Sequence, residues 1–517
     1  MRIATAGLIL AAMANPLFAA PPTITLDQGA LAGTEADGIR IFRDIPFAGD
    51  AGGEHRWRPP TPAPKWDGVR DASKSGAICP QPSVERGEPI AWISHFTMSE
   101  DCLNLSVYAP VSKPGKKLPV MVWVHGGGAI SGTGSAFDGS GLAKRGVIVV
   151  TLNYRLGLLG RFGHPALSAE QPDALLANYG LMDILAGLKW VRQNIASFGG
   201  DAGNVTLFGQ SSGSVAATAL MASPLSKGLF EKVIGESGVP AQMDYPRYLA
   251  KDLPGSPSLE SAGVAMAGKL LPDIKDVTPA ALRDLSLKSV LDYQSTMPPG
   301  ALVPVTDGKI LPEPVERLFA EGKQLPIPLL VGTVNWEQSL YAHFKLPAAL
   351  IYRTAPKAVV DEHYPDLKDD ALVHQWLADV GFNAPVRWIA NANAQQGHPT
   401  WVYQFTHLSP AAVKAGQPGA AHGDDVPYLF DRQGRDKVDL ANPTERKMQD
   451  VMLGYWAQFA RTGNPNGTNL PAWPRWVAGG HGATQILDVP VRHVEALMGQ
   501  HMQFHLGRYT EMMKTVP

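Results

Sequence analysis

The sequence is short of cysteine, of net charge and of long hydrophobic runs. Its 517 residues include two cysteines and carry a formal net charge of −2, so it has no broad electrostatic field for nucleic acid or an anionic membrane. Beyond the N-terminus no stretch stays apolar for the ~20 residues that a membrane span needs. No metal-spaced His/Cys/carboxylate cluster and no dinucleotide-binding fingerprint occurs. We therefore expect a globular protein that acts on a small molecule without a metal or organic cofactor.

The first twenty residues have the layout of a secretory signal peptide. Arg2 precedes an apolar run from Ile3 to Met13, and the small residues Ala19 and Ala20 stand before two prolines. The alternative is a buried N-terminal helix. We expect cleavage near residue 20 and a secreted or periplasmic mature protein, 21–517, that forms one domain.

The two cysteines are Cys79 and Cys102. In an exported chain with only two cysteines the simplest arrangement is a disulfide bond, and closing a loop of this length stabilises a protein by about 3 kcal/mol. Two free buried thiols are the alternative.

Apolar runs and helical patterns alternate along the chain. Strands are expected at Val120–Val124, Gly146–Tyr154, Val205–Phe208, 328–332 and Trp401–Phe405, and helices at Tyr179–Val191 and Val215–Met221, with a break at Gly199–Asp201. This alternation predicts an α/β fold with an open, mostly parallel sheet flanked by helices. The stretches 241–300 and 345–395 are expected to be helical insertions.

A small-residue turn follows the strand Val205–Phe208. It reads Gly209-Gln210-Ser211-Ser212-Gly213, a G-x-S-x-G pattern in which small neighbours let a serine occupy a tight turn between strand and helix. Because 53 residues are glycine, the pattern alone is weak evidence, so other motifs must support Ser211 as a nucleophile.

A glycine-rich loop, His125-Gly126-Gly127-Gly128, follows the strand ending at Val124. In the α/β-hydrolase pattern such a loop and the backbone N–H after the nucleophile, here that of Ser212, receive the oxyanion. The alternative is a flexible turn. Its position after a buried strand and before the serine favours the oxyanion loop.

Candidates for the acid and the base follow the serine in the required order. Glu337 lies in the loop after the strand that ends at Val331, whereas its competitor Asp307 lies before that strand, in a turn. Of two histidines after the strand Trp401–Phe405, His422 stands in a loop of small residues and His407 at the strand end. We favour Glu337 and His422.

The chain resembles the type-B carboxylesterase family, which includes cholinesterases, lipases and para-nitrobenzyl-esterase-like bacterial enzymes. The segments that carry this resemblance are 99–105 (SEDCLNL), 125–128 (HGGG), 153–157 (NYRLG), 198–201 (FGGD), 204–209 (NVTLFG), 421–424 (AHGD), 461–467 (RTGNPNG) and 473–474 (WP). The resemblance implies the α/β-hydrolase fold with helical insertions over the active site.

It also implies roles for individual residues. Ser211 is then the nucleophile, Glu337 the acid and His422 the base of a serine esterase, and Cys79 pairs with Cys102. Gly127, Gly128 and Ser212 are the implied oxyanion donors.

Two supporting contacts are implied as well. The resemblance suggests a buried ion pair between Glu100 and Arg155, and a contact of Ser237 with the acid of the triad.

The sequence departs from the family pattern beside the nucleophile, where Gln210 and Ser212 replace the usual glutamate and alanine. Losing that carboxylate weakens the case for a cationic substrate, so we expect uncharged small-molecule esters. Amides, carbamates and bulky toxin or xenobiotic esters are the alternative substrates, and a non-catalytic binding protein on the same fold is less favoured because all three triad residues are present. Candidate pocket walls are Phe137, Trp336, Phe382 and Met243.

Overall fold

A computed structural model gives the structure of the protein. It describes residues 21–85, 88–111, 115–240, 247–297, 303–342, 346–347, 349–352, 355–432, 438–479, 482–495, 497 and 499–515. The predicted signal peptide, residues 1–20, lies outside the described residues.

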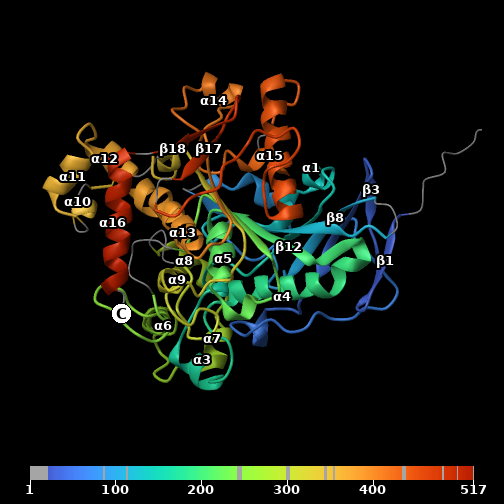
Figure 1. Cartoon of the computed structure of the whole chain (residues 1–517). Helices are drawn as coiled ribbons and strands as arrows, with labels where there is room; N and C mark the ends of the chain where they lie inside the picture. The colour runs from blue at the N-terminus through green and yellow to red at the C-terminus, as the bar shows by residue number, and fades with distance from the viewer. Residues whose placement is uncertain are drawn as a thin grey trace, which may run out of the picture.

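One sheet of eleven strands forms the centre of the molecule (Figure 1). In chain order its strands are β3 (Thr34–Ala36), β4 (Ile39–Pro46), β8 (Asn104–Pro110), β9 (Leu118–Val124), β11 (Ile148–Leu152), β12 (Gly200–Gln210), β13 (Lys232–Glu236), β14 (Leu329–Val334), β15 (Thr400–Phe405), β17 (Ala483–Leu487) and β18 (Arg492–Glu495). Their spatial order is β18-β17-β15-β14-β13-β12-β9-β11-β8-β4-β3.

The middle of the sheet is parallel and its edges are antiparallel. Neighbouring strands run parallel from β11 through β9 to β17, while β3, β4, β8 and β18 pair antiparallel. This confirms the predicted mostly parallel α/β sheet, and all five predicted strands are present. The break expected at Gly199–Asp201 was wrong for Gly200 and Asp201, because both residues belong to strand β12. The pairing of β12 with β9 shifts in register between Gly200 and Val205.

Successive side chains of β9 pack into different cores, as the period of a strand requires. Val120, Val122 and Val124 belong to the core cluster that includes helix α4 (Tyr179–Asn194) and helix α5 (Ser212–Met221). Met121 and Trp123 belong to the other cluster, which includes α15 (Pro443–Thr462). In Figure 1, α4 and α15 accordingly cover opposite faces of the sheet.

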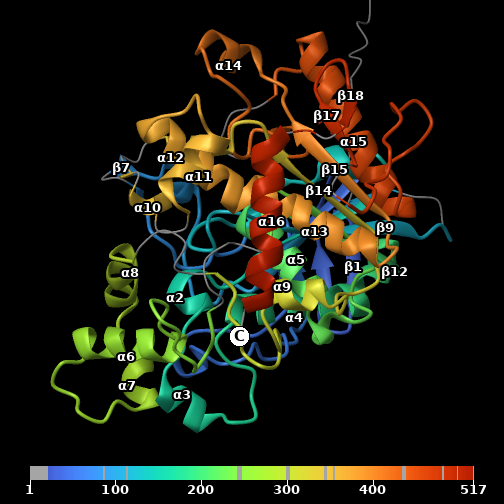
Figure 2. The ribbon, with the colours of Figure 1, turned by 60° about the vertical axis from the view of Figure 1, so that its left-hand side comes forward.

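The expected insertions are helical and stand beside the sheet (Figure 2). The first contains α6 (Leu259–Leu270), α7 (Pro279–Arg283) and α8 (Leu287–Ser295), and the second contains α10 (Ala349–Tyr352), α11 (Lys357–His363), α12 (Asp369–Ala378), the π-helix η7 (Asp379–Asn383) and α13 (Ala384–Gln395). The C-terminal helix α16 (Gly499–Thr515) packs along α13.

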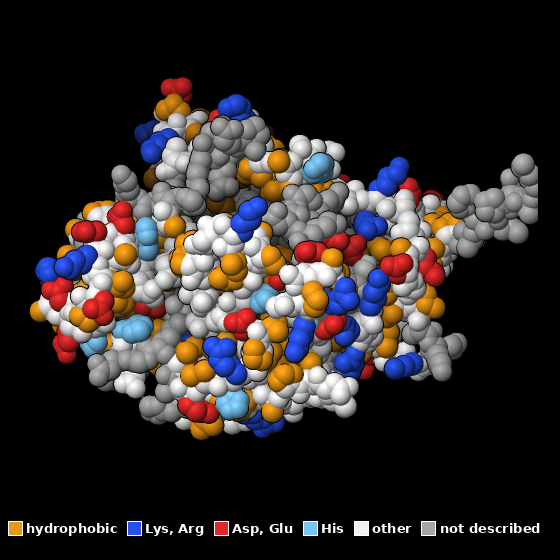
Figure 3. All heavy atoms as spheres, turned by 90° about the horizontal axis from the view of Figure 1, so that it is seen from above, with side chains coloured by type: hydrophobic (Ala, Val, Ile, Leu, Met, Phe, Trp, Pro, Cys, Tyr) orange, Lys and Arg blue, Asp and Glu red, His pale blue; other side chains and the backbone are white. Residues whose placement is uncertain are grey.

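Cys79 and Cys102 form a disulfide bond, as the simplest reading of the two cysteines predicted. Acidic and basic side chains are interspersed over the face seen in Figure 3, in keeping with the small net charge. Within the described ranges, no helix combines the length and the apolar character required to traverse a bilayer.

Candidate active site

Ser211 occupies a strained turn between β12 and α5. Its φ of 55° and ψ of −126° lie outside the usual regions for a residue with a side chain. The backbone holds it there: Ser211 N–H donates to Glu236 C=O at 2.8 Å, and Ser211 C=O accepts from Val215 N–H at 2.9 Å. A Cβ at Gly213 would lie 2.0 Å from the Val124 carbonyl oxygen, so only glycine fits the start of this helix.

The glycine-rich loop lies against this turn with free donors. Gly127 and Gly128 have φ values of 105° and 65° and are exposed, and a Cβ at Gly127 would lie 2.1 Å from Ser131 C=O. Within the described residues, the N–H groups of Gly127 and Gly128 donate to no acceptor, and that of Ser212, the first residue of α5, has no intrahelical partner. Three backbone donors are thus available to an oxyanion.

The Ser212 side chain ties the two segments together. Its hydroxyl oxygen accepts a hydrogen bond from Ala129 N–H at 2.9 Å, and it also interacts with the Tyr154 hydroxyl. Tyr154 in turn donates to His125 C=O at 2.8 Å. The serine that departs from the family pattern therefore fixes the glycine-rich loop to the turn.

Glu337 and His422 are brought together from loops 85 residues apart. Glu337 begins the short 3-10 helix η6 (Glu337–Leu340) and is fully buried. Its Oε2 lies 2.6 Å from His422 Nδ1, and its Oε1 accepts from Val334 N–H at 3.0 Å. These bonds fix the carboxylate and assign the N–H of the neutral imidazole to Nδ1.

Two further residues of η6, Gln338 and Ser339, make contacts around the Glu337–His422 pair. Ser339 Oγ accepts from the His422 backbone N–H at 2.9 Å. Gln338 Nε2 donates at 2.6 Å to Gln375 Oε1 in α12. The Phe382 ring of η7 lies 5.1 Å from the imidazole of His422. The second helical insertion therefore contacts the histidine through Phe382 and the η6 segment through Gln375.

The other imidazole nitrogen, Nε2, faces the nucleophile turn. Gln210 Nε2 lies 3.1 Å from His422 Nε2, so the carboxamide is placed to donate to the lone pair of the neutral ring. In the described part of the chain Ser211 Oγ makes no hydrogen bond with the imidazole. Such catalytic bonds commonly tighten only when substrate is bound.

Two more carboxyl groups are buried behind the pair. Asp425 Oδ2 accepts from the Tyr403 hydroxyl at 3.1 Å, and Glu236 Oε1 accepts from Trp456 Nε1 at 2.7 Å. Burial, together with the nearby charge of Glu337, raises the pKa of Asp425 to about 6. Burial and then Asp425 raise the pKa of Glu236 well above its usual range. Proton binding here relieves negative charge beside Glu337.

His125, in the glycine-rich loop, is no candidate base. Burial lowers its pKa to about 4, so the ring is neutral at physiological pH, and its Nδ1 lies 2.9 Å from Gly126 C=O. It stacks on Tyr154 with ring centroids 4.5 Å apart. Its part is to shape the loop.

Both rejected candidates are bound up in other contacts. Asp307 Oδ1 accepts from the backbone N–H groups of Lys309, Ile310 and Leu311, which makes it the turn residue that was expected. His407 lies between Glu445 and Asp488, with 2.6 Å from Nε2 to Glu445 Oε1 and 3.2 Å from Nδ1 to Asp488 Oδ1.

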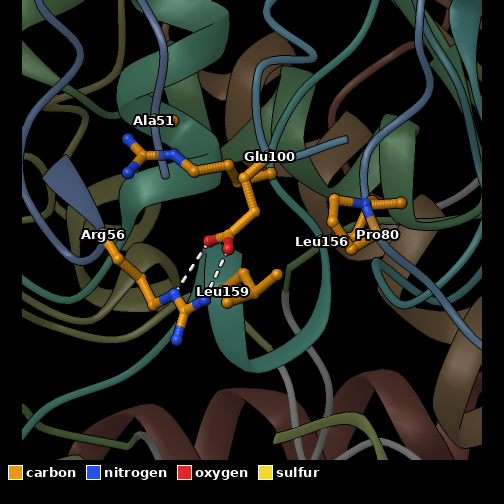
Figure 4. Close-up of a pocket in the computed structure, with 7 residues that line it drawn as sticks. Ala51, Arg56, Pro80, Glu100, Leu156 and Leu159 are labelled. Carbon is orange, nitrogen blue, oxygen red and sulfur yellow. Dashed lines mark hydrogen bonds and ion pairs between the residues drawn. The ribbon is translucent and has the colours of Figure 1, made fainter. Parts of the chain in front are cut away.

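The expected ion pair between Glu100 and Arg155 was wrong. Arg56 Nε and Nη2 contact Glu100 at 2.8 and 2.5 Å, as Figure 4 shows. Arg155 Nε and Nη2 instead contact Asp183 on α4 at 2.8 and 2.7 Å. The fold therefore forms one buried pair, Arg155–Asp183, and one partly buried pair, Arg56–Glu100, each with a partner that sequence reasoning did not single out.

Other supporting predictions fared unevenly. The hydroxyl of Ser237 is buried without a hydrogen-bond partner, so the expected contact with Glu337 involves no hydrogen bond of this hydroxyl. Phe137 lies in the core between Trp123 and Phe430 rather than at His422, whereas Phe382 does contact the histidine. Met243 lies outside the described residues.

No group of three or more His, Cys, Asp or Glu side chains arranged to hold a metal ion occurs among the described residues. The groups that the described residues bring together at this turn are a serine, an imidazole, a carboxylate and backbone N–H donors.

Comparisons with known proteins bear on the family and the fold of the chain. The model of the "Carboxylesterase family" matches residues 20–368 and 358–504. The chain is 33% identical to fumonisin B1 esterase of Sphingopyxis macrogoltabida, over 87% of this chain and 83% of that protein. It is 36% identical to para-nitrobenzyl esterase of Bacillus subtilis (strain 168), over 88% and 92%. A solved PNB esterase structure superposes with a TM-score of 0.79 at 32% identity, covering 93% of this chain and 99% of that one.

Proposed function

Because the chain belongs to the carboxylesterase family, we propose that it hydrolyses carboxylic esters through an acyl-enzyme formed on Ser211. One observation carries the proposal: the carboxylate of the buried Glu337 lies 2.6 Å from His422 Nδ1. The other ring nitrogen of His422, Nε2, faces the strained turn that holds Ser211. Free N–H donors beside that turn complete the set.

In the first half of the reaction His422 acts as general base. With Nδ1–H donated to Glu337, its Nε2 takes the proton of Ser211 as Oγ attacks the ester carbonyl carbon. The N–H groups of Gly127, Gly128 and Ser212 stabilise the negative oxygen; one such donor is typically worth about 3 to 4 kcal/mol. The intermediate collapses when the imidazolium returns the proton to the leaving alcohol oxygen.

Water then repeats the cycle on the acyl-enzyme. His422 removes a proton from water, the hydroxide attacks the acyl carbon, and the proton passes to Ser211 Oγ as the free acid leaves. No step requires a group other than substrate, water and the residues named.

The neutral Gln210 beside the histidine favours a substrate without positive charge, because no carboxylate stands there to attract one. One relative acts, by its name, on fumonisin B1 and others on cocaine, which supports bulky esters as a second substrate class. Residues 1–20 are proposed as a cleaved signal peptide and 21–517 as one exported domain, which the disulfide bond supports.

The direct test is Ser211→Ala. Turnover of a short-chain aryl ester should fall by about 10⁴-fold or more, and labelling by a fluorophosphonate probe should be lost, with thermal unfolding unchanged. An active, correctly folded Ser211→Ala protein would refute the proposal. Wild-type protein that is neither labelled nor active would instead support a binding protein on this fold.

A further inference from the structure

Asp379 is a buried acidic residue at the centre of a hydrogen-bond network behind the Glu337–His422 pair. It begins the π-helix η7, and none of its surface is exposed. Ala384 N–H closes this turn by donating to Asp379 C=O, five residues back along the chain. Turns of this kind are rare and lie frequently at functional sites. None of the reaction steps proposed above uses Asp379, so a part in catalysis would run through its neighbours.

One oxygen of Asp379 accepts two side-chain amides. Its Oδ1 accepts from Gln375 Nε2 at 3.1 Å and from Asn383 Nδ2 at 2.9 Å. Because this oxygen is an acceptor, Gln375 turns its nitrogen toward Asp379 and leaves its Oε1 for Gln338, whose Nε2 donates to it at 2.6 Å. Gln338 directly follows Glu337 in η6. Two hydrogen bonds therefore lead from Asp379 to the residue beside the acid.

A second path runs through the π-helix itself. Asn383, which donates to Asp379, directly follows Phe382 in η7. The Phe382 ring in turn lies 5.1 Å from the imidazole of His422. Asp379 therefore supports both the segment that carries Glu337 and the ring that packs on His422.

The other oxygen of Asp379, Oδ2, binds toward the C-terminal helix. It accepts from the Tyr364 hydroxyl at 2.8 Å, and that hydroxyl lies 2.6 Å from His505 Nε2 on α16. His501, one turn earlier on α16, has its Nε2 3.9 Å from the same Oδ2. Helix α16 stands beside α12, with the rings of Trp376 and His505 4.8 Å apart (Figure 2). The carboxyl group is thus held from both sides, which fixes Oδ1 for its two amides.

We propose that Asp379 is a positioning residue for ester hydrolysis. Its Oδ1 orients the Gln375 carboxamide and the turn of η7, so that Glu337 and Phe382 hold the imidazole of His422 in the orientation that the transition state needs. The inference rests on the proposed esterase function and adds to it a residue that acts through its neighbours. Catalysis is sensitive to such support, because a misplacement of about 1 Å can cost about 100-fold in rate.

The test compares two replacements of Asp379. Asp379→Leu removes the acceptor and keeps a side chain of similar size. In folded protein kcat for a short-chain aryl ester should fall about five- to thirtyfold, the effect of one or two lost hydrogen bonds, with KM nearly unchanged. Asp379→Asn keeps an oxygen for both amides, so it should retain most of the wild-type kcat. Steady-state kinetics and thermal unfolding are measured for each variant.

Gln375→Met cuts only the path to η6. Gln375 is partly buried on α12, and methionine has a similar length and a high helix propensity, so this variant should fold even where Asp379→Leu does not. Its kcat should fall about three- to tenfold. Gln395→Met, exposed at the end of α13, is the matched control and should change neither kcat nor KM.

An unchanged kcat in folded Asp379→Leu or Gln375→Met would overturn the proposal, because these residues would then serve stability alone. A higher KM at constant kcat would overturn it as well, since the effect would then lie in substrate binding. Equal losses in Asp379→Leu and Asp379→Asn would do the same, because they would report the lost charge rather than the lost acceptor. Failure of the esterase proposal looks different: turnover would then be absent from wild-type protein or would persist in Ser211→Ala.

Discussion

Two buried histidines of this protein each stand 2.6 Å from a glutamate, yet only one is placed to act as a base. His422 uses Nδ1 for Glu337 and leaves Nε2 to the neutral amide of Gln210. His407 uses Nε2 for Glu445 and Nδ1 for Asp488.

The difference lies at the second nitrogen. Each ring nitrogen of His407 faces a carboxylate oxygen, so neither nitrogen is open to the hydroxyl of a nucleophile. At His422 one carboxylate fixes the tautomer and the other nitrogen keeps its lone pair, facing the serine turn. A nearby glutamate therefore does not by itself mark a candidate base; a second nitrogen that faces no carboxylate and lies beside a candidate nucleophile does.

The largest contrast is expected from removing each ring. His422→Ala should lower kcat for an aryl ester by about 10⁴-fold or more with little change in the thermal unfolding temperature. His407→Ala leaves the buried carboxylate of Glu445 without its imidazole partner, so it should cost about 3 kcal/mol of stability while folded protein keeps most of its activity. Loss of activity in well-folded His407→Ala would break the comparison.

Replacing Glu337 and Glu445 by glutamine tests the same contrast at the partners of the two histidines. Glu337→Gln keeps the shape but removes the acceptor that fixes the imidazole tautomer, and about a 10⁴-fold fall in kcat is expected by analogy with the aspartate of serine proteases. Glu445→Gln should instead lower the thermal unfolding temperature and leave kcat largely unchanged. Steady-state kinetics and thermal unfolding of both variants check this difference.

Gln210→Glu tests the neutral partner of Nε2. A carboxylate at this nitrogen stabilises the protonated ring, so the free base forms only at higher pH. The acid limb of the kcat/KM profile should therefore move to higher pH, while Gln210→Ala leaves no carboxylate and should not move it in that direction. Coincident acid limbs for wild type and Gln210→Glu would show that this contact does not reach the reacting nitrogen.

The smallest effect is expected at Ser212. Ser212→Ala removes the acceptor of Ala129 N–H, a loss worth about 1 kcal/mol, so kcat/KM should fall roughly five- to tenfold through a looser oxyanion loop. Ser295→Ala, exposed on α8, serves as the control. A larger loss would mean that the hydroxyl itself touches the substrate.

Much of this arrangement could be predicted from local sequence. Val120–Val124 is a short apolar run, and such runs form strands wherever both faces are covered. The order of HGGG, Ser211, Glu337 and His422 along the chain, each after a strand, placed the candidate residues at one edge of a parallel sheet.

The misses are contacts between distant side chains. Nothing near Arg155 marks Asp183 as its partner, because the pairing depends on how α4 packs on the sheet. The antiparallel strands β4 and β8 lacked a distinctive signal beside the stronger central runs. The bond from Gln210 to His422 depends on a rotamer that sequence does not encode.

The link from η6 to α12 affects how members of this family can be recombined. Glu337, Gln338 and Ser339 are consecutive, and they bind the base, the helical insertion and the backbone of the base in turn. The insertion is therefore not an interchangeable module. A chimera that takes residues 345–395 from a relative to change substrate preference will also shift the support of Glu337 and the ring that packs on His422, so its kcat will change together with its KM.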